Sequence, residues 1–498
     1  MDLFGVKRPG KSTRPVDPEE IFKALPKTRD TPNDLWRGQT DALRGWTKKR
    51  KKHDVLISLN TGAGKTLVGL LIAQSIVNEG IENVVYVCST NDLVHQTKRE
   101  ADKIGLPCTL RMSAGFSNDL FATGQSFCVT NYPTITQPFS VFNKTPYLAG
   151  AFIFDDAHVG ENWIRDSFTL SLSDSEFPGV NNEIEALYAQ EFKDANQFQR
   201  FSEVRKGQTQ EFLMAPPGSS RRHGASLTTI LNTAKLKDHD RLKYRWHHLK
   251  DHLSECAVTF GPGGIEIAPP FLPSLALPAL HRADVRRVYL SATLRQRSDF
   301  ARAFGRLPDE VVAPTSDAGE GERLILYSSS FPKELDPPTL VATLSRKQKT
   351  LISVPTTKAA DRWAKFGKPP AAENFTAELE AFRKKGTGTF ILVSRFDGID
   401  LPDEQCRIMI MDGLPASVGL LERFLWATVG VQSLFAARIA NRITQLFGRI
   451  NRGRRDYGVF IATQLDITNW LRRDRNIALF PDTLQKQGIH PIEAALPG

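Results

Sequence analysis

Two stretches of the sequence carry residues whose types and spacing suit phosphate and metal chemistry. The first, LISLNTGAGKTLVGLL (56–71), joins a strand-like run to a helix-like run through a glycine-rich turn. Gly62 and Gly64 would let backbone amides curl around phosphate oxygens. Lys65 would reach the β and γ phosphates of a nucleotide, and Thr66 would ligate magnesium. Leu59 replaces the first glycine of the usual GxxxxGK[ST] pattern, which matters little if the turn widens only at Gly62 and Gly64. The alternative is a chance glycine turn before a helix.

The second stretch, AFIFDDAHVGEN (151–162), ends an apolar run in two adjacent aspartates. A phosphate-binding turn needs an acidic strand end that holds the metal ion and orients water. Asp155 would bind magnesium at the strand tip, directly or through water. Asp156 would polarise the water that attacks the γ-phosphate. Alone, the two aspartates could instead cap a helix, so this interpretation depends on the first stretch.

Alternating strand-like and helix-like runs predict the elements that position these residues. Such alternation is typical of βαβ units and a parallel sheet, so an α/β fold is expected. The strand-like runs are 54–59, 83–89, 126–131, 151–156 and 286–293 in the first part of the chain, and 349–357, 388–394, 406–414 and 457–464 in the second.

The same runs divide the chain into a lead-in, two α/β domains and an insertion. Residues 1–30, rich in proline and basic side chains, are expected to be mobile or loosely packed. Strand-like runs become scarce after about residue 160, which favours a mostly helical insertion. The expected boundaries are 31–160 and 281–320 for the first domain, 161–280 for the insertion and 321–498 for the second domain.

The composition restricts the class of protein. The chain has 498 residues and a formal net charge of +10, a basic balance that favours polyanionic partners such as nucleic acid. Its five cysteines are far apart and none forms a CxxC pair, which indicates reduced thiols rather than a disulfide framework or a zinc or iron–sulfur site. No apolar run approaches the roughly 18 residues of a membrane span. We therefore expect a soluble, cytoplasmic protein without membrane contact.

Six further stretches complete an ordered set of motifs. They are LWRGQTDAL (35–43), VCSTNDLVHQ (87–96), VTNYPTI (129–135), LSATL (290–294), SRFDGIDLPDEQCRIMIMDGLP (394–415) and QLFGRINRGRRDYG (445–458). With the two stretches above, their order resembles that of the superfamily 2 DEAD/DEAH-box-like helicases. The last two are closest to motifs V and VI of the XPD/DinG branch. That branch typically carries four iron–sulfur cysteines, which this chain lacks, so no iron–sulfur cluster is expected.

The resemblance implies roles for individual residues. The implied nucleotide-binding residues are Gln39 (the adenine reader), Thr61, Gly62, Ala63, Gly64, Lys65, Thr66 and Asp400, and the implied magnesium ligands are Thr66 and Asp155. The implied catalytic residues are Lys65, Asp156, Gln445, Arg449 and Arg452, with the two arginines as arginine fingers. The implied strand contacts are Thr90, Thr130, Asn131, Thr356 and Ser394, and the implied coupling residues are His158, Ser291 and Thr293.

For the whole chain, the resemblance implies an ATP-dependent helicase or translocase with ATP and magnesium between two RecA-like P-loop domains. The expected partner is nucleic acid, and DNA with a single-stranded segment is favoured because motifs V and VI resemble a DNA-repair branch. Two alternatives stay open: an RNA-directed or non-unwinding remodelling ATPase, and a motor subunit of a multi-protein nuclease or defence assembly. Structural uses also stay open for two motifs: an amphipathic helix start around Gln39 and a basic surface helix for RINRGRR.

Overall fold

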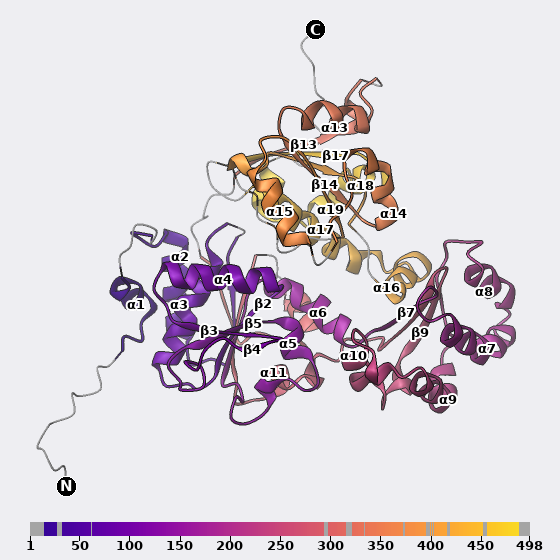
Figure 1. Cartoon of the computed structure of the whole chain (residues 1–498), viewed down its shortest axis with the longest axis horizontal. Coiled ribbons are helices and arrows are strands. Elements are labelled where there is room, and N and C mark those ends of the chain that lie inside the picture. The colour runs from indigo at the N-terminus through magenta and orange to yellow at the C-terminus, as the bar shows by residue number, and fades with distance from the viewer. Residues whose placement is uncertain are drawn as a thin grey trace, which may run out of the picture.

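Three β-sheets organise the computed structural model of the chain (Figure 1). The structure describes residues 14–26, 32–60, 62–292, 297–314, 321–332, 334–371, 374–394, 399, 401, 403–415, 419–451 and 456–487. Two of the sheets carry the sequence motifs at the ends of mostly parallel strands, and the third is antiparallel. Among the helices in these residues, none has the length and apolar character needed to cross a membrane.

The first sheet is built from the apolar runs of the N-terminal part of the chain. Its strands are β1 (Asp54–Ser58), β2 (Val84–Cys88), β3 (Cys108–Met112), β4 (Gly115–Phe116), β5 (Phe127–Asn131), β6 (Ala151–Phe154), β11 (Arg286–Ser291) and β12 (Glu310–Val312). Their order in the sheet is β12-β1-β11-β6-β2-β5-β3-β4, and only the β3–β4 pair is antiparallel. The central strands are apolar along their whole length because both faces of the sheet are buried.

Helices cover both faces of this sheet. On one face lie α1 (Pro18–Ala24), α2 (Arg37–Lys49), α3 (Lys65–Asn78) and α4 (Asn91–Lys103), which share a hydrophobic core with the strands. On the other face lie α6 (Gly160–Ser167), α11 (Pro278–His281) and α12 (Arg297–Phe304). The short helix α5 (Tyr132–Thr136) follows β5. In this sheet only β11 separates β1 from β6, so the ends of β1 and β6 lie close together.

Part of the expected lead-in is packed rather than loose. Asp17 caps α1, and Ile21 and Phe22 of this helix are each only 4% exposed. The segment before α1 is also held, because Asn78 Nδ2 donates a hydrogen bond to the Pro15 carbonyl oxygen at 2.6 Å. Burial of these two large apolar side chains holds α1 against the sheet. The basic composition of residues 1–30 did not indicate this packing.

The insertion contains a sheet as well as the expected helices. Its helices are α7 (Pro178–Asp194), α8 (Phe198–Arg205), α9 (Ser219–Thr233) and α10 (Lys243–Leu249), and its strands are β7 (Leu170–Ser173), β8 (Leu213–Met214), β9 (Ala257–Gly261) and β10 (Gly264–Ala268). The strands form an antiparallel sheet in the order β7-β10-β9-β8. Sequence analysis missed this sheet because β7 and β8 are short and pair with distant residues. The β9–β10 hairpin, with Pro262 and Gly263 as its turn, was the signal that would have revealed it.

A continuous hydrophobic core joins the insertion to the first sheet. Phe154 at the tip of β6, Phe168 and Leu172 near β7, and Phe260 in β9 belong to the same cluster of buried side chains. The insertion therefore packs as an extension of the first α/β unit and is not tethered to it by a loose linker alone.

The second α/β unit repeats the parallel architecture. Its strands are β13 (Glu322–Tyr327), β14 (Lys349–Val354), β15 (Gly388–Val393), β16 (Ile408–Met411) and β17 (Tyr457–Ala462), in the order β13-β17-β16-β14-β15. Its helices are α13 (Pro337–Ser345), α14 (Thr357–Ala360), α15 (Phe375–Lys384), α16 (Leu420–Phe424), α17 (Gln432–Ile450), α18 (Leu465–Leu471), α19 (Asp474–Ile477) and α20 (Asp482–Lys486). Separate cores lie on the two faces of this sheet. The expected α/β class with two parallel sheets is confirmed.

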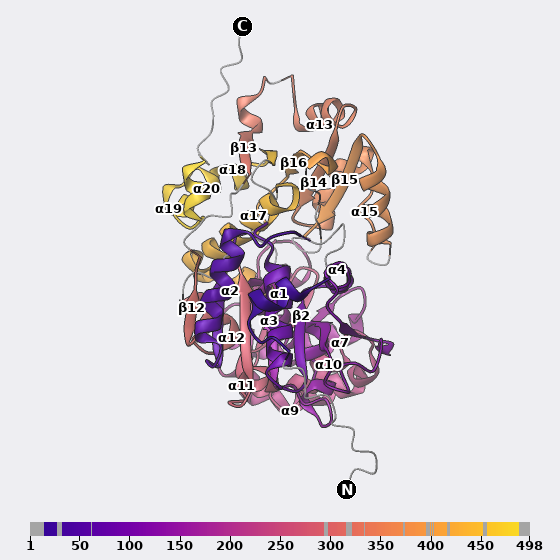
Figure 2. The same ribbon diagram turned by 90° about the vertical axis from the view of Figure 1, so that its left-hand side faces the viewer.

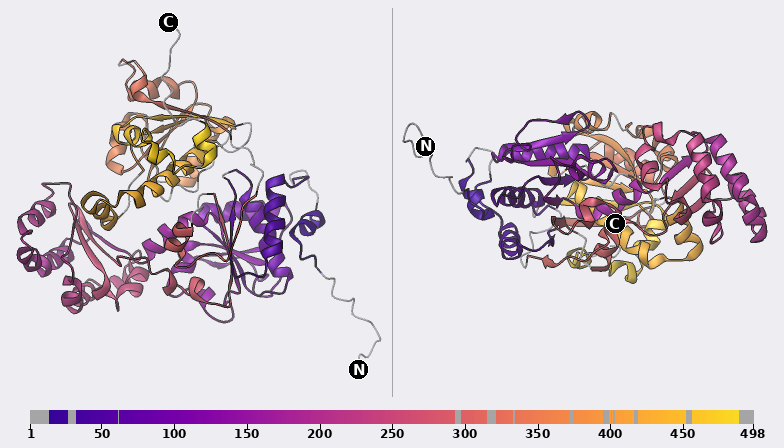
Figure 3. Two further views of the ribbon diagram at one scale, coloured as in Figure 1. Left: turned by 180° about the vertical axis from the view of Figure 1, so that it is seen from behind. Right: turned by 90° about the horizontal axis from the view of Figure 1, so that it is seen from below.

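The second α/β unit lies over the first and also reaches the insertion. Figures 1 and 2 both show the strands β13–β17 above the first sheet, and the rear view in Figure 3 shows the same arrangement. Helix α16 extends toward the insertion (Figure 1), where the Glu266 carboxylate of β10 accepts hydrogen bonds from Leu420 N at 2.8 Å and Leu421 N at 3.1 Å. A carboxylate at the amino end of a helix satisfies donors that the helix leaves unpaired. This contact ties the insertion to the second unit.

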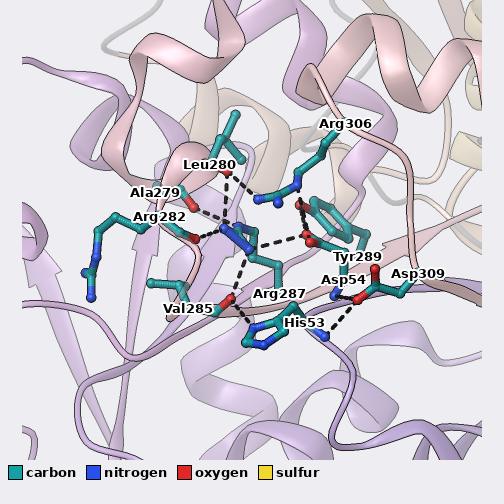
Figure 4. A network of polar contacts seen from close by, with 10 residues as sticks. All are labelled: His53, Asp54, Ala279, Leu280, Arg282, Val285, Arg287, Tyr289, Arg306 and Asp309. Atoms are coloured by element: carbon teal, nitrogen blue, oxygen red, sulfur yellow. Dashed lines mark hydrogen bonds and ion pairs between the residues drawn. The ribbon is translucent and has the colours of Figure 1, made fainter.

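A buried polar network anchors the amino ends of β1 and β11 (Figure 4). Arg287 is 1% exposed, and its guanidinium donates to the Ala279 carbonyl at 3.0 Å and the Val285 carbonyl at 2.9 Å. It also pairs with the Asp54 carboxylate at 3.4 Å, which accepts a further hydrogen bond from the Tyr289 hydroxyl at 3.0 Å. Burial raises the pKa of Asp54 above its usual value, and the neighbouring guanidinium opposes this. The network fixes the strands whose opposite ends form the site described next.

Candidate functional site

The glycine-rich turn after β1 adopts a conformation that requires glycine. Gly62 has φ of 84° and Gly64 has φ of 73°, both in the left-handed region. A Cβ atom at Gly64 would lie 2.2 Å from Gln39 Nε2, so a larger residue would collide with that side chain. Helix α3 begins at Lys65 directly after the turn, and its first amides have no partner within the helix. The turn and helix start therefore form a cradle for an anion.

Gln39 holds this turn from helix α2. Its side chain is buried, its Nε2 donates to the Ala63 carbonyl oxygen at 3.3 Å, and its Oε1 accepts from Trp36 N at 3.0 Å. The amide thus links the start of α2 to the phosphate turn. The adenine-reading role implied by the sequence remains a prediction for this residue.

Asp155 ends β6 beside the turn. Its Oδ2 accepts a hydrogen bond from the Tyr86 hydroxyl at 2.9 Å, and its Oδ1 accepts from Asp156 N at 2.9 Å. Burial, together with the adjacent Asp156 charge, raises the pKa of Asp155 to about 6. A bound cation would favour the ionised carboxylate that burial disfavours, so the residue fits the predicted role of a magnesium ligand.

Asp156 turns the chain sharply after β6. Its φ of 45° is in the left-handed region, which is uncommon for residues other than glycine, although aspartate tolerates it better than most. Its Oδ1 lies 3.4 Å from Lys65 Nζ. The two motif residues predicted to serve the γ-phosphate and its attacking water are therefore neighbours, although they come from different strand ends.

A cavity of about 360 Å³ is lined by predicted nucleotide-binding, magnesium-binding and catalytic residues, and both α/β units contribute to it. The predicted residues that line it are Gln39, Gly62, Gly64, Lys65, Thr66, Asp155, Asp156 and Arg449. Arg449 comes from α17 of the second unit, and its Nη1 donates to the Ile399 carbonyl oxygen at 3.1 Å. Leu93, Gln96 and Glu100 of α4, which sequence analysis did not select, complete one wall.

Other predicted residues lie elsewhere. Gln445 is half-buried one turn before Arg449 on α17 and does not line the cavity. The Ser291 carbonyl at the end of β11 accepts from Leu59 N at 2.9 Å, which joins that strand to the phosphate turn. Four predicted residues lie outside the described part of the chain: Thr61, Thr293, Asp400 and Arg452.

His158 is half-buried two residues after Asp156, and both of its ring nitrogens are enclosed by the protein. Burial lowers the pKa of its imidazole to about 4, so the ring is neutral near pH 7. Neither ring nitrogen has a hydrogen-bond partner among the described residues. An enclosed polar atom without a partner is costly, and the coupling role implied for His158 stays a prediction.

Two predicted strand contacts occupy matching positions in the two α/β units. Thr90 follows β2 and caps α4, its Oγ1 accepting from Leu93 N at 3.3 Å. Thr356 follows β14 and caps α14, its Oγ1 accepting from Ala359 N at 3.1 Å. Both threonines therefore lie at a helix start that follows the carboxyl end of a strand, a position with free backbone donors for phosphate.

The remaining predicted strand contacts differ in accessibility. Asn131 at the end of β5 accepts from Thr134 N at 2.9 Å and donates to Asn91 Oδ1 at 2.6 Å. Ser394 has φ of 46° and its hydroxyl donates to the Pro355 carbonyl. Thr130 is fully buried and its hydroxyl donates to the Arg111 carbonyl at 2.9 Å, so this side chain has no access to a bound strand.

A buried ion cluster links the two α/β units, and sequence analysis did not predict it. Arg438 of α17 pairs with both Glu161 of α6 and Glu422 of α16. Arg165 bridges the same carboxylates at 3.3 and 3.2 Å, and Arg302 Nε lies 3.4 Å from Glu161. Helix α6 begins four residues after Asp156, and α17 carries Arg449. The cluster thus joins α6, which follows the two aspartates of the first unit, to α17, which carries Arg449 of the second unit.

Comparison with known proteins agrees with this architecture. Residues 34–168 match the family model described as type III restriction enzyme, res subunit, and residues 339–469 match the helicase C-terminal domain. No curated protein matches the sequence.

Solved structures share the fold over almost the whole chain. An apo XPD structure is similar with a TM-score of 0.57 and 15% identity, covering 88% of this chain and 98% of that one. Xpd4 of S. tokodaii is similar with a TM-score of 0.55 and 18% identity, covering 90% and 97%. At such low identity these structures show only that the fold is similar. The two family models match the segments that carry most of the sequence motifs. Two segments of the chain thus match the models of the type III restriction enzyme res subunit and of the helicase C-terminal domain, and the fold of almost the whole chain is similar to that of XPD.

Proposed function

We propose that this chain hydrolyses ATP between its two α/β units and uses the cycle to move along a nucleic-acid strand, with DNA preferred over RNA. One observation supports this most strongly: Arg449 of the second unit lines the same cavity as Lys65 and the two aspartates of the first. Neither unit alone holds a complete set of groups for phosphoryl transfer. Hydrolysis therefore depends on how the two units sit together.

Each residue has a distinct role in this proposal. The amides around Gly62 and Gly64 and the Lys65 ammonium bind the phosphates of ATP. Thr66 and Asp155 would hold magnesium, which would supply positive charge to neutralise the phosphates of ATP. The described residues contain no group of three or more His, Cys, Asp or Glu side chains that could hold a metal ion. In this proposal the phosphates of ATP provide further oxygen ligands.

Asp156 and Arg449 act on the transferred phosphate from different α/β units in this proposal. The Asp156 carboxylate accepts a hydrogen bond from the attacking water and orients it toward the γ-phosphate. The Arg449 guanidinium offers fixed donors to charge that develops on the transferred group. Both residues line the cavity, with Arg449 contributed by the other unit. ATP thus favours the closed arrangement of the units, and loss of phosphate releases it.

Strand contacts from both units would convert this closure into movement. Thr90, Asn131, Thr356 and Ser394 lie at or just after the carboxyl ends of strands in the first and second sheets. Contacts from such positions reach phosphates and sugars, which makes binding tolerant of sequence. When the units close, the two sets of contacts shift relative to each other along the strand.

Strand displacement with an Arg449 variant tests this proposal. We expect the wild-type chain to separate DNA duplexes with a single-stranded tail in the presence of ATP, and to act more weakly on RNA duplexes. Arg449→Ala should bind ATP with nearly unchanged affinity but hydrolyse it about a hundredfold more slowly or worse, and displacement should be lost. Loss of ATP binding with normal turnover at saturating ATP would contradict the role given to Arg449.

A motor subunit of a larger nuclease assembly is the second candidate. The match of residues 34–168 to a family described as the res subunit of type III restriction enzymes favours it. In that case the chain would hydrolyse ATP on DNA without separating strands by itself. Displacement or cleavage that appears only when a co-purified partner is added would support this alternative.

A further inference from the structure

A second cavity lies where the second α/β unit meets the insertion. It has a volume of about 290 Å³ and is bounded by the first part of α17, by Phe212 of the insertion and by the π-helical turn Leu425–Val429 that follows α16. Figure 1 shows α16 between the second sheet and the insertion, which is where these elements converge. A π-helical turn is uncommon and often marks a functional position.

Aromatic side chains form the walls of this cavity. Trp426 of the π-helical turn is half-buried and packs edge-to-face on the buried Phe435, with ring centres 5.6 Å apart. Phe212 contributes a second ring from the insertion. Phe435 therefore holds Trp426 in place, and Trp426 and Phe212 are the two partly exposed rings that line the cavity.

Guanidinium groups accompany the aromatic rings. The Arg423 guanidinium lies 5.4 Å from the centre of the Phe212 ring, and Arg442 lines the cavity while its Nη1 donates to the Pro415 carbonyl at 3.1 Å. Rings and planar guanidinium groups in one cavity provide stacking surfaces and hydrogen-bond donors together. An apolar peptide side chain would need the rings but not these donors.

The cavity adjoins the proposed strand path. Thr356, one of the predicted strand contacts, lines it together with Pro355. Phe212 and Arg423 also line a larger cavity of about 760 Å³ between α16 and the β7–β10 edge of the insertion. A strand whose phosphate lies at the start of α14 would therefore have the aromatic cavity directly beside its backbone.

We infer that this aromatic cavity receives an unstacked base of the bound single strand, with Trp426 and Phe212 as stacking surfaces and Arg442 as a hydrogen-bond donor. The inference rests on the proposed function, because it assumes that a strand passes Thr356. Stacking on an aromatic ring tolerates any base, which suits a motor that moves along arbitrary sequence. The insertion then contributes to strand binding through Phe212.

A fluorescent base tests the inference directly. A thymidine oligonucleotide with one central 2-aminopurine is bound to the full chain in the presence of a non-hydrolysable ATP analogue. We expect the wild-type chain to quench the 2-aminopurine emission and Trp426→Ala to lose this quenching. Strand affinity of Trp426→Ala should fall about 5- to 150-fold, the range for losing one stacked base. Trp426→Phe keeps a ring and should retain most of the affinity and quenching.

Phe271→Ala is the matched control, because Phe271 is 85% exposed and lines neither cavity. Its affinity and quenching should equal those of the wild-type chain, and equal thermal unfolding midpoints of all variants would show that each is folded. Wild-type quenching and affinity that persist in a folded Trp426→Ala variant would overturn the inference. If Trp426→Ala unfolds, Phe212→Ala takes its place, and wild-type quenching and affinity in that folded variant would overturn the inference. Failure of the wild-type chain to bind any strand would instead contradict the proposed function.

Discussion

At the scale of single residues, the chemistry proposed here depends on two aspartates with different surroundings. Asp155 accepts hydrogen bonds from Tyr86 and from the next backbone amide, whereas Asp156 lies in a left-handed conformation near Lys65. These different surroundings suit Asp155 to hold a cation and Asp156 to orient water. Although Asp155 and Asp156 are adjacent in the sequence, the sharp turn at Asp156 gives the two carboxylates different neighbours.

Substitutions at Asp156 should show how closely its length is matched to its task. Asp156→Ala removes the group that orients water, and ATP turnover should fall about a hundredfold to ten-thousandfold. Asp156→Glu keeps a carboxylate one methylene further out and should retain measurable turnover, since many proteins of the resembled family have glutamate at this place. Steady-state phosphate release measures both variants. A glutamate variant as inactive as the alanine variant would show that the left-handed turn at Asp156 admits only the shorter acid.

At the scale of elements, the sequence predicted the strands and helices that carry motifs, and missed contacts between distant segments. The run 54–59 and the turn at Gly62 and Gly64 indicated β1 and the phosphate cradle because their signals are local. The sheet of the insertion depends on pairing between β7 and β10, about ninety residues apart, which no local pattern encodes. The pairing of Arg438 with Glu161 was equally inaccessible from sequence.

The Arg287 network should stabilise the first sheet. Arg287→Met would leave Asp54 buried with less compensation and several carbonyl groups without donors, at a cost of about 3 to 5 kcal/mol in the free energy of unfolding. We expect a clearly lower thermal unfolding midpoint. Arg44→Met is the control, because the Arg44 pair with Glu19 is on the surface and should contribute less than about 1 kcal/mol. Equal midpoints for the two variants would mean that the network contributes little.

The ion cluster around Glu161 should position α17 against α6. Arg438→Met removes the side chain that joins both carboxylates, so Arg449 on the same helix would be held less well at the cavity. ATP turnover at saturating ATP should fall about tenfold or more, while ATP affinity changes little. Arg222→Met, which breaks an exposed pair with Glu191 in the insertion, should leave turnover unchanged. Unchanged turnover in a folded Arg438→Met variant would show that the cluster does not act on Arg449.

At the scale of the whole molecule, the second unit touches both other parts of the chain. It reaches the first unit through the cavity residue Arg449 and through a hydrogen bond from Thr376 Oγ1 to Asp92 Oδ1 at 2.6 Å. It reaches the insertion through Glu266 and the amides of α16. If the units close around ATP as proposed, we expect the geometry of the aromatic cavity near Trp426 to change as well. The order of the motifs predicted two such units, but their contacts with the insertion could be found only in three dimensions.

ATP hydrolysis as a function of added single strand tests the central claim most directly. The purified chain should hydrolyse ATP slowly alone and faster as single-stranded DNA is added, with a weaker response to RNA. The strand concentration needed for half of the effect should rise with salt, because phosphate contacts release counterions. Lys65→Ala should remain near background at every strand concentration. A wild-type rate that stays flat with both DNA and RNA, or normal turnover by Lys65→Ala, would contradict the account.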